Sequence, residues 1–348
     1  MVLMRDVDVA LHDALEPPPC VTQIFAYDWA ISRVIALPEI WTLLAKYGVG
    51  VNPGMSDLYW AVQLTIVCQA ARIRVMEWLS TLRDADLRGN FPYHGNSLTS
   101  LPAAFMFGPG LSALEFLRLD CNRLTTLPAT LGNFSLLADL DLSTNRLTSL
   151  PAEIGGLSSL IILHLYGNLL PHLPAELGRL SLLTDLWVQD NRLTCVPVQL
   201  GDLVSLVDLR LENNQLASLP AELGRLTSLE ELRLETNKLL SIPTELGTLR
   251  SLEVLNVSNN QLVSVPSELG SLSSLERLNL SCNRLESIPA SFGALISLQR
   301  LILRENELTD LPAQFAELTA LEVLDLSDND FDQIPDIPVE LLGIAWIN

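Results

Sequence analysis

The side chains that most often carry catalysis are sparse in this chain and do not fall into catalytic spacings. Its four histidines are dispersed (His12, His94, His164, His172). No His-x-x-x-His or Cys-x-x-Cys spacing indicates a zinc site. The sequence has no glycine-rich loop that would cradle a phosphate and no glycine-flanked serine nucleophile. We therefore expect no catalytic residue, no metal and no cofactor.

One histidine, His164, has carboxylates within reach on neighbouring turns of the repeat described below, at Asp141 and Asp185. Such a group can in principle exchange a proton, and acidic pairs on the same surface can bind a cation weakly. An open surface that does not exclude water is unfavourable for both proton transfer and cation binding. The sequence therefore predicts a protein that is not an enzyme.

These residues are positioned by an internal repeat of 23 residues, with the template Leu-x-x-Leu-x-Leu-x-x-Asn-x-Leu-x-x-Leu-Pro. A period of this length predicts a solenoid. Each turn should add one strand to a parallel sheet, about 4.8 Å from its neighbour. The asparagine of each turn should satisfy backbone groups of its own and of the neighbouring turn. This structural ladder comprises Asn122, Asn145, Asn168, Asn191, Asn214, Asn237, Asn260, Asn283, Asn306 and Asn329.

The Leu-Pro that ends the template is usually followed by x-x-Leu-Gly-x-Leu, as in Ala175 to Leu180. Proline fixes the backbone without wasting a needed N–H, so it suits the start of the other half of the turn. We predict a short turn or helix there, with the glycine supporting a tight bend or a left-handed residue.

This 23-residue unit with Leu-Pro-x-x-Leu-Gly resembles the intracellular Ras-group-related leucine-rich repeat family of plants and its animal relatives. The resemblance implies an α/β fold, a leucine-rich repeat solenoid curved like a horseshoe, with a parallel sheet on its concave face. It also implies a protein that holds partner proteins and has no catalytic residues in its repeats.

The chain divides by composition into three parts. Residues 1–28 form an acidic arm that ends in three prolines, Pro17 to Pro19, and we read it as flexible. Residues 29–86 have helical apolar spacing and form an α-helical N-terminal cap region. Residues 87–348 hold about 11 repeats, of which the first and last are degenerate. In the first repeat, Phe91 and Tyr93 stand at the positions of the strand leucines.

Within the cap region, Leu37-Pro38-Glu39-Ile40-Trp41, with Leu43-Leu44 and a later Val67-Cys68, resembles a divergent F-box. That family docks an adaptor of the ubiquitin-ligase scaffold and often carries leucine-rich repeats that read the substrate. The resemblance implies docking by Leu37, Pro38, Ile40, Trp41, Leu44, Val67 and Cys68. The alternative is a plain helical cap over the first repeat, which a solenoid needs in any case.

The net charge of the chain restricts the classes of partner that we expect, and its cysteine content indicates the cellular compartment. A formal charge of -20 argues against nucleic acid and anionic membranes, and it leaves a partner with a basic patch open. The five cysteines are scattered and odd in number, which favours a reducing compartment. No apolar signal core begins the chain and no apolar run reaches membrane-spanning length. We expect a cytoplasmic protein that does not enter a membrane.

Recognition should reside at the variable strand positions that face outward from the concave sheet. Tyr, Trp and Arg dominate interface hot spots. An exposed Trp187 on a polar strand face would therefore indicate a binding surface. The alternative is that Trp187 merely packs on His164 and Arg210. By comparison, the polar stretch from Asn256 to Ser281 has no aromatic or arginine side chains at the two variable positions nearest each asparagine, and we expect it to contribute little to binding. The predicted partner-binding residues are Ile162, His164, Tyr166, Asp185, Trp187, Asp208, Arg210, Glu212, Arg233 and Glu235.

The leading function is a non-catalytic protein–protein interaction scaffold that binds its partner on the concave surface, in intracellular signalling. The second is an F-box-type substrate receptor of a ubiquitin ligase. A pathogen-type effector, or a fragment of a larger enzyme, is the remaining class.

Overall fold

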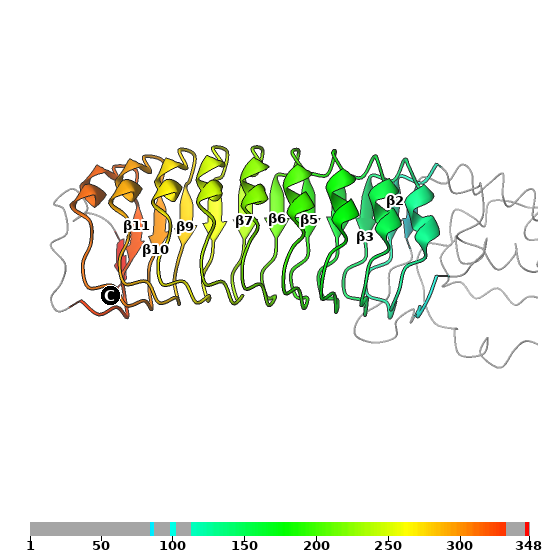
Figure 1. Cartoon of the computed structure of the whole chain (residues 1–348), viewed down its shortest axis with the longest axis horizontal. Helices are drawn as coiled ribbons and strands as arrows, with labels where there is room; N and C mark the ends of the chain where they lie inside the picture. The colour runs from blue at the N-terminus through cyan, green and yellow to red at the C-terminus, as the bar shows by residue number, and fades with distance from the viewer. Residues whose placement is uncertain (1–83, 87–97, 102–112, 332–344, 348) are drawn as a thin grey trace, which may run out of the picture.

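The computed structural model describes residues 84–86, 98–101, 113–331 and 345–347. In this part of the chain, short strands alternate with short 3-10 helices, one of each per turn. All strands belong to one parallel sheet of twelve strands, whose order in space equals their order in the chain. Figure 1 shows the turns stacked side by side along one axis. This is the architecture of a solenoid.

Every strand among the described residues is three residues long. The strands are β1 (Asp84–Asp86), β2 (Phe116–Arg118), β3 (Asp139–Asp141), β4 (Ile162–His164), β5 (Asp185–Trp187), β6 (Asp208–Arg210), β7 (Glu231–Arg233), β8 (Val254–Asn256), β9 (Arg277–Asn279), β10 (Arg300–Ile302), β11 (Val323–Asp325) and β12 (Ala345–Ile347). The 3-10 helices are η4 (Ala129–Asn133), η5 (Ala152–Gly156), η6 (Ala175–Arg179), η7 (Val198–Asp202), η8 (Ala221–Arg225), η9 (Thr244–Thr248), η10 (Ser267–Ser271), η11 (Ala290–Ala294) and η12 (Ala313–Glu317).

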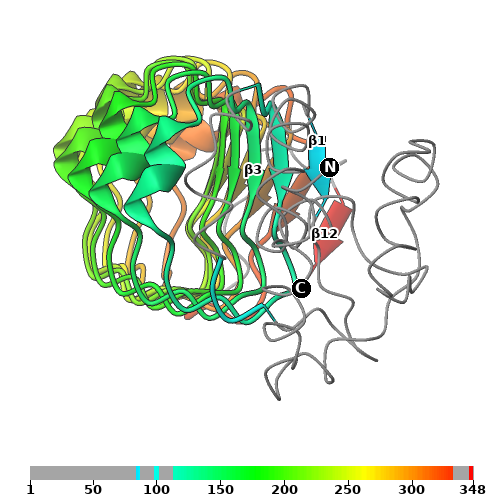
Figure 2. The ribbon, with the colours of Figure 1, turned by 90° about the vertical axis from the view of Figure 1, so that its right-hand side faces the viewer.

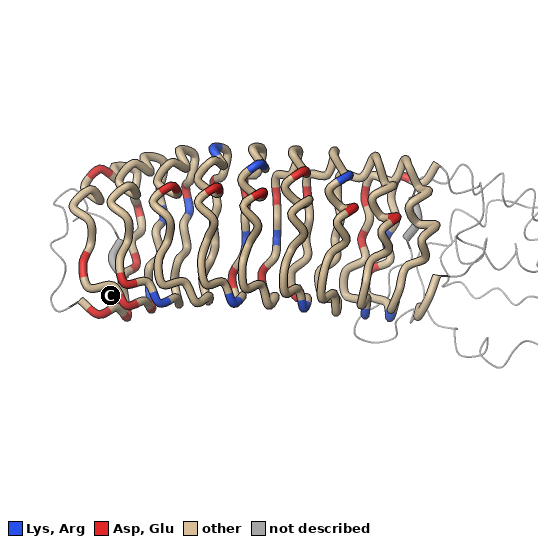
Figure 3. Tube along the Cα trace, viewed as in Figure 1, with Lys and Arg blue, Asp and Glu red and all other residues tan. Residues whose placement is uncertain are grey.

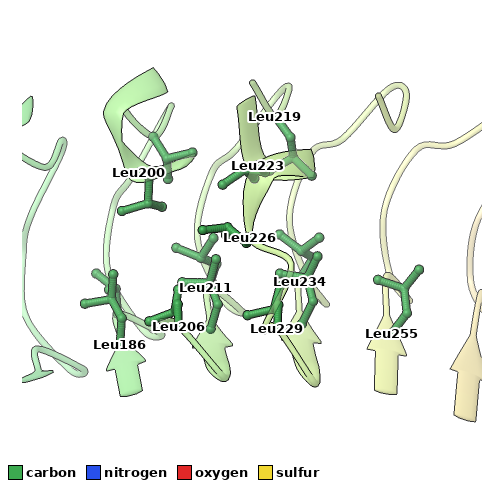
Figure 4. Packing of buried hydrophobic residues seen from close by; sticks show 14 of the residues in the cluster. Leu186, Leu200, Leu206, Leu211, Leu219, Leu223, Leu226, Leu229, Leu234 and Leu255 are labelled. Atoms are coloured by element: carbon green, nitrogen blue, oxygen red, sulfur yellow. The ribbon is translucent and has the colours of Figure 1, made fainter. Parts of the chain in front are cut away.

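The sheet and the 3-10 helices lie on opposite sides of the body, as the end view in Figure 2 shows. The core between them consists mainly of leucines at the fixed template positions. Leu186, Leu206 and Leu226 are fully buried there, and Figure 4 shows how such side chains from successive turns interlock. Since each turn contributes the same leucines, the core runs unbroken along the array.

The ladder asparagines tie each turn to the one before it. The Nδ2 group of Asn214 donates to the carbonyl oxygens of Leu211 at 3.1 Å and of Val188 on the preceding turn, also at 3.1 Å. Its Oδ1 accepts from the N–H of Leu193 at 2.9 Å. The same three kinds of bond recur at Asn145 and at Asn329. Each asparagine thereby satisfies backbone groups that would otherwise be buried without partners.

We expected the glycines of the 3-10 helices to support a tight bend or a left-handed residue, and the second of these is wrong. Among the described glycines only Gly167 has a positive φ, so those in the helices do not support left-handed bends. A Cβ on Gly224 would instead lie 2.5 Å from the carbonyl oxygen of Glu245 on the next turn. Adjacent 3-10 helices therefore approach so closely that a side chain at this position has no room.

The left-handed position lies elsewhere, at the residue just before each ladder asparagine. Here φ is between 52° and 66°, and most of these residues are not glycine. Thr144 and Thr236 are β-branched, a residue type that is strained in this region. The full row is Cys121, Thr144, Gly167, Asp190, Asn213, Thr236, Asn259, Cys282, Glu305 and Asp328.

At the N-terminal end, the strand that pairs with β2 is β1, with Asp84 opposite Phe116. The sequence placed the first strand leucines later, at Phe91 and Tyr93, and both lie outside the described residues. The predicted acidic arm, residues 29–83 of the predicted helical cap and all seven F-box-like docking residues also lie outside them. The last three residues of the predicted cap, Asp84–Asp86, are not helical but form β1 of the sheet. Among the described residues, no helix is long and apolar enough to cross a bilayer.

Candidate functional site

The side of the sheet that points away from the core is formed by the residues six, four and two positions before each ladder asparagine. We call it the open sheet face. Successive strands are paired one repeat apart, so equivalent residues stand side by side; Asp185, for example, is opposite Asp208, and Trp187 is opposite Arg210. The face is therefore three parallel rows of side chains, and its chemistry changes from turn to turn.

Trp187 is held between its neighbours on β4 and β6. Its ring is stacked on His164, with centroids 4.1 Å apart and an interplanar angle of 19°. The guanidinium carbon of Arg210 lies 4.2 Å from the centroid of the same ring. The indole N–H donates to Oδ2 of Asp208 at 2.9 Å. We expected an exposed Trp187; it is half-buried, and the packing on His164 and Arg210 that we set out as the alternative is present.

Two arginines of this region are paired with acidic residues on the same face. Arg210 contacts Oδ2 of Asp208 at 2.9 Å and approaches Glu231 at 3.9 Å. Arg233 pairs with Glu231. In both pairs the acidic residue lies six positions, and the arginine four positions, before the ladder asparagine of the same turn. The positive charge of each arginine is therefore largely compensated by its acidic neighbour.

In the row two positions before the asparagine, three consecutive turns each carry a side-chain oxygen without a hydrogen-bond donor in the described part of the chain. Oε1 of Gln189, Oε2 of Glu212 and Oε2 of Glu235 are buried, and within the described residues they accept no hydrogen bond from the protein. Burial, together with the negative charge of Glu235, raises the pKa of Glu212 to about 7. Burial also raises the pKa of Glu235. These acceptors favour a ligand that brings hydrogen-bond donors or positive charge.

Other turns of the same face are closed by internal hydrogen bonds. On the turn of β8, Ser258 donates its N–H and its hydroxyl to Oδ1 of Asn256, at 3.1 and 2.8 Å. Asn279 and Ser281 repeat this arrangement on the next turn. The stretch that looked bland in sequence is thus polar but internally satisfied, and it offers a partner few unused groups.

The histidine–carboxylate group has little capacity for proton transfer. Nδ1 of His164 is 3.9 Å from Oδ2 of Asp141, and Ser143 donates twice to the other oxygen of this carboxylate. Burial alone would raise the pKa of Asp141, but the nearby His164 and the hydrogen bonds from Ser143 outweigh it and hold the pKa below its ordinary value. Among the described residues, no group of His, Cys, Asp and Glu has the geometry to hold a metal ion.

The remaining predicted residues lie on the same turns. Ile162 is opposite Asp185 in the pairing of β4 and β5, and Asp185 accepts the hydroxyl of Thr184 at 2.5 Å. The ring of Tyr166 lies 6.3 Å from that of His164. Gln189 was not in the predicted set, although it occupies the same template position as Glu212. That shared position was the signal that would have identified it.

Comparison with known proteins agrees with this geometry. Residues 112–170 and 273–331 match a family model described as leucine rich repeat. Residues 250–292 match a second one, described as leucine rich repeats in two copies. Neither match is to a catalytic family. No curated protein matches the chain in sequence.

Among solved structures, the LRR ectodomain of the membrane receptor kinase GASSHO1/SCHENGEN3 from Arabidopsis thaliana, in complex with CASPARIAN STRIP INTEGRITY FACTOR 2, is 33% identical, with a TM-score of 0.59. The alignment covers 75% of this chain and 34% of that one. The Arabidopsis receptor kinase HAESA, in complex with the peptide hormone IDA and the co-receptor SERK1, is 34% identical, with a TM-score of 0.61 and coverages of 70% and 42%. The chain thus spans less than half the length of both receptors. By its repeats and by these matches, it is a leucine-rich repeat protein.

Proposed function

We propose that this protein binds a protein partner, without catalysing a reaction, on the open sheet face over β4 to β7. The observation that carries the proposal is the contrast between turns of one face. Turns such as those of β8 and β9 close their polar groups internally. The turns of β5 to β7 leave three buried oxygens without a donor from the described residues.

The rest of the surface fits a peptide or protein ligand. The stack of His164, Trp187 and Arg210 is a rigid, partly accessible ridge, and rigid aromatic and arginine side chains dominate binding energy at interfaces. Glu212 and Glu235 favour a partner that presents a Lys or Arg side chain to them. The complex of HAESA with the peptide hormone IDA supports a peptide-sized ligand as one form of this partner.

A role in intracellular signalling and a cytoplasmic location extend this proposal. They are supported by the scattered cysteines and by the family resemblance of the repeat. The alternative role as a ubiquitin-ligase substrate receptor is supported by the F-box-like residues between Leu37 and Cys68. Recovery of the ligase adaptor by the full chain, and its loss in a Leu37→Ala/Pro38→Ala variant, would establish that role.

The binding proposal is tested by selecting peptides from a random display library on the immobilised full chain and mapping their contact by hydrogen–deuterium exchange. We expect bound peptide to slow amide exchange in β4 to β7 and to leave η6 to η9 unchanged. Protection confined to the 3-10 helices would contradict the proposal, as would selected peptides that bind equally well after Trp187→Ala.

A further inference from the structure

A second charged surface runs along the edge of the array where the chain leaves each strand. The segments from Asn to Pro on seven consecutive turns, Asn122–Pro128 through Asn260–Pro266, contain Arg123, Arg146, Arg192 and Lys238 and no Asp or Glu. The next turn, Asn283–Pro289, adds Arg284 but also Glu286, and Asp190 stands two residues before Arg192. Figure 3 shows blue positions recurring along the lower edge of the array, with red positions near several of them.

The cations follow a regular spacing. Arg146, Arg192, Lys238 and Arg284 are spaced by 46 residues, which is two repeats of 23. Arg123 stands one repeat before Arg146 and falls outside this spacing. The turns between them carry Leu169, Gln215 and Gln261 at the same position. We call the four cations the basic edge. Because turns are about 4.8 Å apart, their spacing is about 9.6 Å.

At the basic edge the backbone is held by hydrogen bonds between turns, whereas the side chains are exposed. The N–H of Arg192 donates to the carbonyl of Leu170 on the preceding turn at 3.0 Å, and Lys238 bonds in the same way to Leu216 at 2.9 Å. All four side chains are exposed. In the described part of the chain, no ion pair is formed by any of them, and Lys238 alone makes a side-chain hydrogen bond, to Gln215 at 3.3 Å.

The spacing selects among acidic partners. In an extended strand, side chains on one face recur about every 6.7 Å, which does not match. In an α-helix, residues seven apart lie on one face and about 10.5 Å apart, which does match within the reach of arginine and lysine side chains. Nucleic acid carries a far denser charge, about one per 1.7 Å of duplex, which does not match this spacing either.

We propose that the basic edge is a docking site for an α-helix of a partner protein that bears Asp or Glu at every seventh residue. The edge lies outside the open sheet face, so the proposal is independent of the binding function assigned to that face.

The test uses the full chain and a fluorescein-labelled Ala/Gln-rich helical peptide of about 24 residues, with Glu at every seventh position. Its control is an isomer of the same composition whose Glu residues are spread around the helix. Fluorescence anisotropy at low ionic strength should show binding of the first peptide. The isomer, and the variant Arg192→Gln/Lys238→Gln/Arg284→Gln, should each weaken it about tenfold.

A second variant separates spacing from net charge. Arg192→Gln/Gln215→Arg moves one cation by a single turn and leaves the total charge unchanged. We expect about threefold weaker binding, with an unchanged melting curve by circular dichroism. Equal affinity of this variant and the wild type, or of the two peptides, would overturn the proposal. So would tighter binding of single-stranded RNA or phosphatidylserine vesicles that the triple variant abolishes.

Discussion

The indole of Trp187 lies almost parallel to the imidazole of His164, with ring centroids 4.1 Å apart. The two residues are 23 positions apart and stand side by side on β4 and β5. Arg210 covers the same indole from the next strand. The most conspicuous aromatic side chain of the open sheet face is therefore a rigid part of the sheet, and its position is set before any partner arrives.

We expect Trp187→Ala to lower the free energy of unfolding by about 1–2 kcal/mol, because it removes both stacking contacts and the donor to Asp208. Trp187→Phe keeps an aromatic ring between His164 and Arg210 and should lose less. Urea denaturation measures both. An unchanged midpoint for Trp187→Ala would show that the stack contributes no stability.

Stability should depend on the charge of Glu212. Its pKa is about 7 in the folded protein against an ordinary 4.5, so the folded state binds the proton more tightly than the unfolded state. Stability is then lost as pH rises through that window. We expect Glu212→Gln to raise the free energy of unfolding at pH 8 by about 1 kcal/mol, a reduced figure because the side chain is partly exposed.

At pH 4 the wild-type carboxyl is largely protonated in both states, so Glu212→Gln should change stability little. Thermal unfolding at the two pH values gives the comparison. A stabilisation of equal size at both would mean that the carboxylate charge is not the cause.

Substitution of a ladder asparagine should cost stability, whereas substitution of the residue before it by glycine should not. Asn214→Ala removes the bonds to Leu193, Leu211 and Val188 and should destabilise the protein by about 1–3 kcal/mol. Asn213 has a φ of 53°, a conformation that glycine adopts without strain. Asn213→Gly should therefore be nearly neutral. Chemical denaturation that ranks the two variants the other way would refute the assigned roles.

Packing between 3-10 helices makes a further prediction. Gly224→Ala places a Cβ 2.5 Å from the carbonyl oxygen of Glu245, so η8 and η9 must move apart, at a cost of about 1–3 kcal/mol. The adjacent Arg225→Ala removes only an exposed ion pair with Asp202 and should cost much less. Calorimetry distinguishes them, and equal melting temperatures would exclude the close contact.

Much of the fold could be predicted because its causes repeat. One template places a leucine at Leu186 and again at Leu209, so periodicity alone predicted the parallel sheet and the continuous core. The left-handed backbone expected at Gly224 is absent. The close approach to Glu245 that requires a glycine there depends on three-dimensional packing, which the sequence does not show. The left-handed row at Thr144 and Thr236 has no consistent residue type, and the sequence therefore did not reveal it.

The candidate site could be predicted only as a set of neighbours. The template places Trp187 beside His164 and Arg210, but it does not say whether the indole is covered or free. The unpaired oxygens of Gln189 and Glu212 depend on side-chain conformations, which repeat spacing does not determine. The spacing of the basic edge can be read from the sequence alone. The structure adds that its four side chains are exposed.

The most direct test of the central claim is the dissociation constant of a library-selected peptide for three proteins, measured by isothermal titration calorimetry. They are the wild type, Trp187→Ala, and Arg300→Ala as a control on the same face outside β4 to β7. We predict at least tenfold weaker binding for Trp187→Ala and an unchanged constant for Arg300→Ala. Equal affinity of the wild type and Trp187→Ala would contradict recognition on this surface.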